Sequence, residues 1–339
     1  MTKTNDFSCY LAKFLCIYLP GEKGVSSNTV ASYKDTFILL LLFMKEKKKI
    51  PAEKITLEQL SAETICEFLA WLEESRGSSA ATRNIRLAAI RSYFKFVQYQ
   101  DPGYIALCQE ISAIPLKKTA APTANYLSLE GIRCLLEEPD LRTASGRRDL
   151  ALLSLMYCSG ARVQEIIDLT PADIHLDFPY TVKLTGKGSK SRLVPLMEEQ
   201  IKHLRVYMEE NGFTEPGTYS HSLFANRQGN PLTRAGINYI LSKYAAKARK
   251  KHPGLIPEKL SCHCLRHSIA MHLLQSGVNL VYIRDILGHT SVQVTEIYAR
   301  ADSKQKREAI EKAYTDVMPN EEPIWLRNND LLSFLKSFR

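Results

Sequence analysis

The chain has 339 residues, 45% of them hydrophobic, and its 45 Lys and Arg against 36 Asp and Glu leave a net charge of +9 at pH 7. This length exceeds what one hydrophobic core usually spans, so we expect two domains, and the basic excess indicates a polyanionic partner. Because no 18 apolar residues run together and the first residues lack a cleavage signal, we expect neither a membrane span nor export.

Three stretches in the first hundred residues show apolar residues at helical spacing. Residues 26–49 predict a helix of three to four turns, residues 56–77 predict two short helices ending near Gly77, and residues 78–98 predict another helix. Four basic residues stand among the apolar positions of the last helix: Arg83, Arg86, Arg91 and Lys95. Residues 1–111 are therefore expected to form an all-helical domain.

Residues 112–125 differ in composition from what surrounds them. The stretch SAIPLKKTAAPTA has two prolines, two lysines and no apolar period, which is typical of an extended linker. Beyond it, residues 147–169 predict helix interrupted at Ser159-Gly160, and residues 180–197 show two period-two stretches around GKGSK, the pattern of a β-hairpin. The fold class expected is mainly α, with a second domain over 126–318 that is mostly helical and contains a small antiparallel β-hairpin.

Near the end of this second domain, histidines and an arginine follow one another at helix turns. His263 and Arg266 are three residues apart and share a helical face, and Gly277 is expected to end their helix. A second helix stops at Gly288, which leaves His289 just past its end. Such an arrangement could converge on one anion, although a single histidine is more often a structural residue.

The cysteines and histidines of SCHCLRH raise the alternative of a zinc site. Cys262, His263, Cys264 and His267 lack an accompanying CxxC pair, so we do not expect a bound metal. The eight cysteines of the chain show no regular framework, which indicates reduced thiols and a cytoplasmic protein.

The last residues form a separate segment. PNEEP interrupts the preceding helix, and residues 324–339 then carry eight large apolar residues in sixteen. So many apolar residues should be buried, either against their own domain or against another subunit.

Five of these stretches together resemble the tyrosine site-specific recombinases, also called the phage integrase family. HCLRHSIAMHL is similar to the family's HxLRHxxAxxL box, LGH to its second histidine box, SGARVQEIIDL to its first arginine box and TGKGSKSRLVPL to its lysine hairpin, and Tyr298 stands nine residues beyond the second-box histidine. The resemblance covers nearly the whole chain. It implies that residues 1–111 form a core-binding domain that contacts DNA, with Arg83, Arg86, Arg91 and Lys95 as candidate contacts.

The resemblance implies a role for each matching residue. Tyr298 would attack a DNA phosphodiester, leaving a 3′-phosphotyrosyl bond and a free 5′-hydroxyl. Two guanidinium groups, on Arg162 and Arg266, can hold the non-bridging oxygens bidentately while negative charge develops. Either His263 or His289 could accept the tyrosine proton, and the sequence leaves that choice open.

Two further side chains complete the implied site. Lys187 at the hairpin tip is the candidate acid that protonates the leaving oxygen, with Lys183 and Lys190 as rivals. Glu165 lies three residues after Arg162 and is expected to orient it, unless it is an ordinary surface glutamate. Since arginines supply the positive charge and these boxes hold no acidic cluster or ATP-binding loop, we expect no metal and no other cofactor.

The expected partners are double-stranded recombination sites and a homotetramer assembled on paired sites, in which residues 319–339 are exchanged as a C-terminal helix. A second recombinase could also take part, and we expect the protein to be associated with the nucleoid. A type IB topoisomerase shares this chemistry, and a non-catalytic DNA-binding protein is a second alternative. The sequence does not distinguish integration, excision, inversion and dimer resolution.

Overall fold

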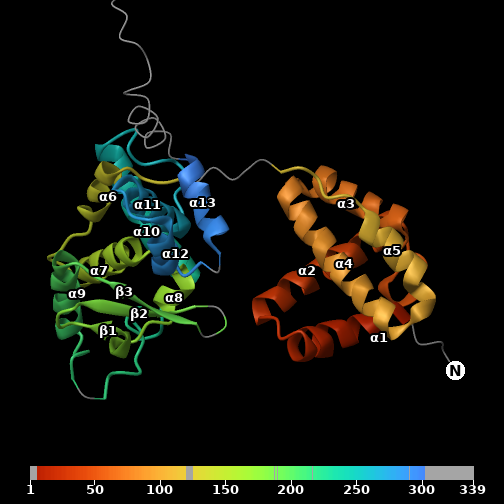
Figure 1. Cartoon of the computed structure of the whole chain (residues 1–339), viewed down its shortest axis with the longest axis horizontal. Coiled ribbons are helices and arrows are strands. Elements are labelled where there is room, and N and C mark those ends of the chain that lie inside the picture. The colour runs from red at the N-terminus through yellow and green to blue at the C-terminus, as the bar shows by residue number, and fades with distance from the viewer. Residues whose placement is uncertain are drawn as a thin grey trace, which may run out of the picture. The chain divides into compact units, whose positions relative to one another are not determined.

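A computed structural model describes residues 6–119, 125–186, 188, 190–215, 217–289 and 291–301 of the chain. Its contacts divide the chain into two compact units, Met1–Pro122 and Thr123–Arg339, each with a hydrophobic core of its own (Figure 1). Helices predominate in both units, and the strands of the second form one small antiparallel sheet. The mainly α fold class predicted from the sequence is confirmed.

The first unit consists of helices packed around an aromatic core. Its helices are α1 (Asp6–Lys13), α2 (Ser27–Lys47), α3 (Ala62–Arg76), α4 (Ala80–Gln100) and α5 (Ile105–Ala113), with a π-helix at Phe14–Glu22 and 3₁₀ turns at Ala52–Lys54 and Pro102–Tyr104. The hydroxyls of Ser61 and Ser79 cap α3 and α4 by accepting a backbone N–H three residues later. In the core, the ring of Tyr93 meets Phe14 and Phe37 edge to face, at centroid distances of 5.5 and 5.1 Å.

Two helix predictions for this unit were wrong in length or number. The helix predicted for residues 26–49 is 21 residues long in α2, nearly six turns and not three to four. Residues 56–77 form one helix, α3, because Thr56 donates its N–H to Gln59 in a preceding turn and the helix starts only at the Ser61 cap. The predicted end at Gly77 is confirmed, since this residue takes a left-handed conformation at φ 61°.

The predicted linker, residues 112–125, starts within the first unit and not beyond it. Helix α5 continues to Ala113, and Ile114 is buried in the core of this unit. Lys117 and Asn84 then exchange two hydrogen bonds of 3.0 and 2.8 Å between the backbone of Lys117 and the amide of Asn84. The first part of the predicted linker is thus fixed to α4, because Ile114 is packed in the core of the first unit; residues 120–124 lie outside the described part.

Three of the four basic residues predicted to contact DNA instead connect parts of the first unit. Arg83 is buried and donates to the carbonyl of Pro115, and Arg91 donates to the carbonyl of Ile114. Arg86 donates to the carbonyl of Ser32 and the hydroxyl of Thr36, both on α2, at 2.9 and 3.0 Å. Apolar residues flank these arginines on the inward face of α4, so their guanidinium groups donate to backbone carbonyls within the unit. Lys95, by contrast, is exposed.

These contacts predict that Arg86→Ala lowers the free energy of unfolding by about 1 to 3 kcal/mol, because two hydrogen bonds from a charged donor to α2 are lost. Lys95→Ala on the same helix is the matched control and should change stability by less than about 0.5 kcal/mol. Urea denaturation followed by circular dichroism measures both. Equal stability of the two variants would contradict the structural role of Arg86.

The second unit packs helices against one three-stranded sheet. Its elements are α6 (Leu129–Leu136), α7 (Ala144–Ser159), α8 (Val163–Ile167), a 3₁₀ turn (Pro171–Asp173), β1 (Ile174–His175), β2 (Thr181–Thr185), β3 (Ser191–Pro195), α9 (Glu198–Glu210), α10 (Arg234–Lys251), α11 (Cys262–Gln275), α12 (Leu280–Leu287) and α13 (Val292–Ala301). The predicted hairpin is confirmed as β2 and β3, which pair antiparallel with Val182 opposite Val194. Strand β1 adds a third strand that the sequence did not predict.

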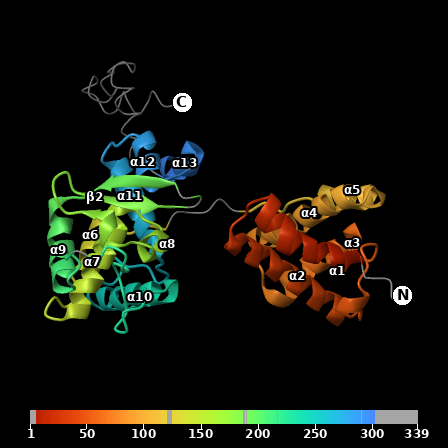
Figure 2. The same cartoon turned by 90° about the horizontal axis from the view of Figure 1, so that it is seen from below.

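The sheet and the last helices place the site within this unit. Figure 2 shows the strands along one side of the unit and α10 along the opposite side. Helices α11, α12 and α13 pack on one another, and α12 also contacts β3 (Figures 1 and 2). The arginine, histidine and tyrosine boxes are thereby brought beside the hairpin. Within the described residues, no helix has the length and apolar character that crossing a membrane requires.

Candidate active site

Arg162 is placed by a break between two helices. Helix α7 ends at Gly160, where φ is 57° and a Cβ would come within 2.8 Å of a methyl carbon of Leu287, so only glycine fits. Two residues later Arg162 is the N-cap of α8, and its guanidinium donates to Glu165 at 2.9 Å and to the carbonyl of Gly288 at 3.3 Å. Its side chain is 39% exposed, which leaves part of the guanidinium open to a ligand.

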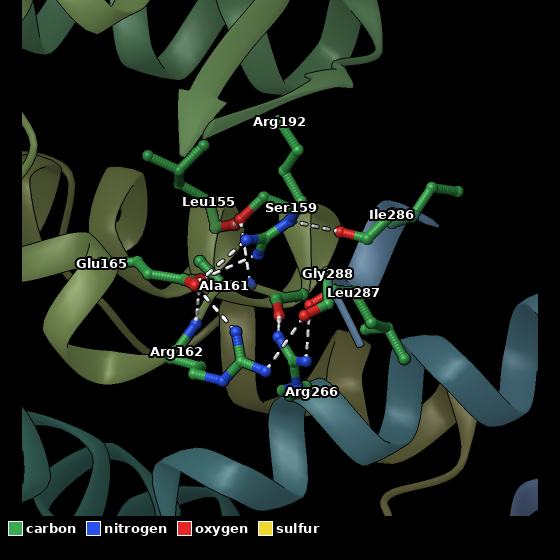
Figure 3. Close-up of polar contacts among 11 residues, drawn as sticks. Leu155, Ser159, Ala161, Arg162, Glu165, Arg192, Arg266, Ile286, Leu287 and Gly288 are labelled. Carbon is green, nitrogen blue, oxygen red and sulfur yellow. Dashed lines mark hydrogen bonds and ion pairs between the residues drawn. The ribbon is translucent and has the colours of Figure 1, made fainter. Parts of the chain in front are cut away.

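Glu165 is buried beneath this arginine and is no ordinary surface residue. Its carboxylate accepts the backbone N–H of Arg162 at 2.8 Å and a bidentate pair of hydrogen bonds from Arg192 of β3, at 3.0 and 2.8 Å (Figure 3). Burial raises the pKa of Glu165, but the hydrogen bonds from Arg192 and from the Arg162 backbone outweigh it and hold the pKa below its usual value. Glu165 is therefore a buried carboxylate that accepts hydrogen bonds from both the backbone and the guanidinium of Arg162.

Arg266 projects from α11 and is 4% exposed. It donates to the carbonyl of Gly160 at 2.5 Å and to that of Leu287 at 2.6 Å (Figure 3). Burial, followed by the nearby charge of Arg162, lowers its pKa to about 10, so it is still a cation at neutral pH. The two predicted arginines thus lie together beneath one surface, held by backbone carbonyls from separate segments.

Both predicted histidines lie near these arginines. Gly288 takes a left-handed conformation at φ 63° and ends α12, and the following His289 bonds through Nδ1 to the hydroxyl of Thr295 at 3.0 Å. Burial lowers the pKa of His289 to about 4, helped by the positive charges of Arg266 and Arg162. His263 on α11 also has a lowered pKa, through burial and then Arg266. Both imidazoles are consequently neutral at pH 7 and can accept a proton.

Tyr298 lies on α13 and is almost fully buried, with 1% of its surface exposed. Its ring packs in a cluster with Met271 and Leu287, and its hydroxyl lies 2.8 Å from Nδ1 of His267. Burial raises the pKa of Tyr298, and the opposing charges of Arg266 and Arg162 do not reverse that shift. The phenol is therefore protonated at neutral pH.

His267 and Arg192 also lie at this site; the sequence raised His267 only as a possible zinc ligand and did not single out Arg192. His267 follows Arg266 in the quoted box and is four residues from His263, so the two share a face of α11, with ring centroids 6.4 Å apart. Arg192 lies two residues before the buried Val194 in β3 and therefore shares its face of the strand, and an arginine on that inward face could have indicated an internal partner.

The remaining predicted residues are placed as follows. Lys187 lies outside the described residues, and its rivals Lys183 and Lys190 are both exposed. A Cβ on Gly186, next to Lys187, would lie 3.0 Å from Glu165 Oε1, so the hairpin approaches the arginine site closely. Cys262 donates its thiol to the amide oxygen of Asn238, and within the described residues no three His, Cys, Asp or Glu side chains group as metal ligands.

The lowered pKa of His289 predicts a loss of stability in acid. Between pH 6.5 and about 4 the unfolded chain binds a proton that the folded chain excludes, so the stability due to neutral His289 is complete above pH 6.5 and is lost as the pH falls toward 4. Urea denaturation at pH 7, 6 and 5 should show a weaker pH dependence in His289→Gln than in the unchanged protein. Exposed His203→Gln is the control, and identical pH dependence in both variants would contradict the shift.

Two family models match the chain. The model described as phage integrase family matches residues 125–305, and the one described as phage integrase, N-terminal SAM-like domain, matches residues 12–100. Among named proteins, the putative integrase/recombinase y4rC of Sinorhizobium fredii is 33% identical over 337 residues, covering 99% of this chain and all of that protein. Tyrosine recombinase XerD of Staphylococcus haemolyticus is 33% identical over 288 residues, covering 85% of this chain and 92% of XerD.

Solved structures share the fold. The XerH site-specific recombinase in its post-cleavage complex with palindromic difH substrate has a TM-score of 0.67 at 25% identity, covering 83% of this chain and 79% of that chain. The Tn1549 transposon integrase in complex with transposon right end DNA also has a TM-score of 0.67, at 17% identity, covering 89% and 99% of the two chains.

Proposed function

This chain belongs to the phage integrase family and is a site-specific tyrosine recombinase, and on that premise we propose that Tyr298 is the residue that joins it to DNA. The observation that supports this assignment is the position of the Tyr298 hydroxyl, which lies 2.8 Å from Nδ1 of His267, the residue that follows Arg266 on α11. Family membership favours this activity over the topoisomerase and the non-catalytic binding protein.

In this proposal the arginines stabilise the reacting phosphate. The phenolic oxygen of Tyr298 attacks phosphorus, the bond from phosphorus to the 5′-oxygen breaks, and a 3′-phosphotyrosyl bond remains. The phosphodiester brings one negative charge and gains more in the transition state. Arg162 offers the more exposed guanidinium, and Arg266 supports the same charge from beneath it.

Two protons have to move in this reaction. The Tyr298 proton leaves as its oxygen attacks, and His263, His267 and His289 each offer an imidazole with a lowered pKa; of these, His267 already bonds the phenol. The 5′-oxygen takes up a proton as it departs, and we assign that donor to Lys187 from its place in the hairpin sequence. Rejoining follows the same path in reverse, with the 5′-hydroxyl of the other strand as nucleophile.

The test is to recover the DNA that the protein attacks. Purified protein is incubated with sheared chromosomal DNA of its host and denatured in detergent, and fragments that stay attached to protein are sequenced after proteolysis. We expect one recurring sequence, attached through its 3′-phosphate, and the same result in excess EDTA. Recovery of no attached DNA, from a preparation that binds DNA, would contradict the proposed activity.

Lys95 is the one candidate DNA contact of the first unit that stays open to a phosphate, since its three neighbouring arginines serve internal carbonyls. We propose that it contributes to binding through charge, which the slope of affinity against salt would report. The recombination serves one of four processes: integration, excision, inversion or dimer resolution. Because the substrate is chromosomal or element DNA, we place the protein in the cytoplasm with the nucleoid.

We further propose that four copies assemble on paired sites by exchanging the segment 319–339, which lies outside the described residues and is rich in apolar side chains. Exchange among four subunits would make the state of one Tyr298 depend on its neighbour, so that alternate subunits cleave at one time. A second recombinase in the same assembly is compatible with this scheme.

A chain truncated after Met318 tests the exchange. It should stay folded and bind single sites, yet fail to form the tetrameric complex on paired sites, as measured by light scattering and by slow bands in native gels. A truncated chain that still forms the tetramer and recombines would contradict the exchange. One that unfolds would indicate that the segment packs on its own subunit.

A further inference from the structure

Three arginines from three different elements bind three consecutive carbonyls at the end of α12. Arg192 of β3 donates through Nε to Ile286 at 2.7 Å, Arg266 of α11 donates to Leu287 at 2.6 Å, and Arg162 donates to Gly288 at 3.3 Å (Figure 3). The last carbonyls of a helix have no partner within the helix and carry its partial negative charge. The end of α12 is thus a common acceptor for the cations of the site.

Arg192, like Arg266, makes its hydrogen bonds to groups inside the protein. Its side chain is 12% exposed, and its donors go to both oxygens of Glu165 and to the Ile286 carbonyl. Gly288 leaves room for it, since a Cβ at that position would come within 2.8 Å of the Arg192 guanidinium. A planar fork is required for this geometry, and a lysine ammonium cannot reproduce it.

The charge of Arg192 affects how strongly Glu165 binds the Arg162 guanidinium, because both arginines donate to this carboxylate. Glu165 is buried and accepts from both arginines, so it is shared between them. Without Arg192, the buried carboxylate would have Arg162 as its remaining cation, and the undivided charge of Glu165 would then compete with a phosphate for the Arg162 guanidinium. With Arg192 present, the three arginines and one carboxylate leave two positive charges for the ligand.

We propose that Arg192 is a positioning residue for the recombination reaction: it satisfies Glu165 and fixes the end of α12, and so holds Arg162 ready for the non-bridging oxygens of the scissile phosphate. The inference rests on the proposed function. It assigns Arg192 no contact with DNA, because its donors are used inside the protein.

The experiment compares strand cleavage of two substrates that carry the sequence recovered by covalent trapping. One has a normal phosphodiester at the cleaved position, and the other has a methylphosphonate, in which a methyl group replaces one non-bridging oxygen and removes the negative charge. On the phosphodiester, Arg192→Gln should cleave about 10- to 100-fold more slowly than the unchanged protein, with DNA affinity retained. Arg192→Lys should be slowed as well, because it keeps the charge and loses the fork.

On the methylphosphonate, Arg192→Gln should cleave within about threefold of the rate of the unchanged protein, and so should Arg162→Ala. The reason is that this substrate lacks the negative charge that the arginines are proposed to stabilise. Loss of folding would slow both substrates equally. Arg147→Gln is the matched control, since it breaks an arginine–glutamate pair with Glu210 at the other end of α7 and should cleave at the normal rate.

The outcomes separate the inference from the proposed function. If the unchanged protein cleaves and Arg192→Gln cleaves equally fast, or is equally slow on both substrates, the positioning role is wrong and the activity stands. If the unchanged protein cleaves neither substrate, the proposed function fails. A defect confined to the phosphodiester, present in Arg192→Lys and absent in Arg147→Gln, supports the inference.

Discussion

Tyr298→Phe should reduce the covalent protein–DNA complex to background while DNA binding is retained. The substitution removes one oxygen from a ring that packs in an apolar cluster, so the ring can stay in place. What disappears is the proposed nucleophile itself. The hydrogen bond to His267 is lost too, which should cost about 1 kcal/mol of stability and leave the fold intact.

The measurement uses a labelled duplex of the trapped sequence, nicked so that the cleaved end diffuses away and the covalent complex accumulates on a denaturing gel. Tyr282→Phe is the matched control, because that phenol is 67% exposed on α12 and should be dispensable. Tyr314, which lies outside the described residues, is the other phenol nearby in sequence. A covalent band of normal intensity from Tyr298→Phe would move the assignment to another tyrosine.

Arg162→Ala and Arg266→Ala should each slow cleavage by about 10²- to 10³-fold, the usual effect of removing one preorganised charge contact to a transition state. The two should differ in stability. Arg266 is buried and satisfies the carbonyls of Gly160 and Leu287, so its loss leaves buried acceptors unpaired at about 1 to 3 kcal/mol each. Arg162 is more exposed, and its loss should affect the rate more than the fold.

Single-turnover cleavage and urea denaturation of the same preparations distinguish these effects. Arg205→Ala serves as control, because this exposed arginine of α9 makes a backbone contact to Leu176 within the second unit. Arg266→Lys keeps a cation and should recover part of the stability while remaining slow, since a lysine cannot bind two carbonyls and a phosphate in one plane. A normal cleavage rate in Arg162→Ala would exclude that arginine from phosphate binding.

Several elements of the site could be predicted because neighbouring residues determine them. The break at Ser159-Gly160, the hairpin over 180–197 and the stop at Gly288 are all confirmed. Each depends on a conformation that glycine alone adopts easily or on an apolar period of two, and both can be read within a few residues. The arginine, lysine, histidine and tyrosine boxes lie in or next to these elements.

Lengths and boundaries were harder to predict, because packing extends or shortens an element beyond its local preference. Helix α2 is nearly twice as long as predicted, since apolar residues along its whole length find partners in the first core. The predicted linker begins too early for a similar reason, as Ile114 is taken into that core. Local composition shows which residues are polar or flexible on average, and tertiary contacts decide which of them are fixed.

The sequence by itself determined the helical class, the hairpin and the residue types proposed for catalysis, whereas tertiary structure alone decided the partners of the buried charges. Hydrogen bonds join residues far apart in the sequence: Arg86 and Ser32 are 54 residues apart, Arg192 and Ile286 are 94 apart, and His267 and Tyr298 are 31 apart. A basic residue in a sequence is equally consistent with a phosphate outside and a carbonyl inside. Burial resolves that choice, because a polar group removed from water is costly unless a partner lies within hydrogen-bonding distance, and only the packing of distant elements provides one.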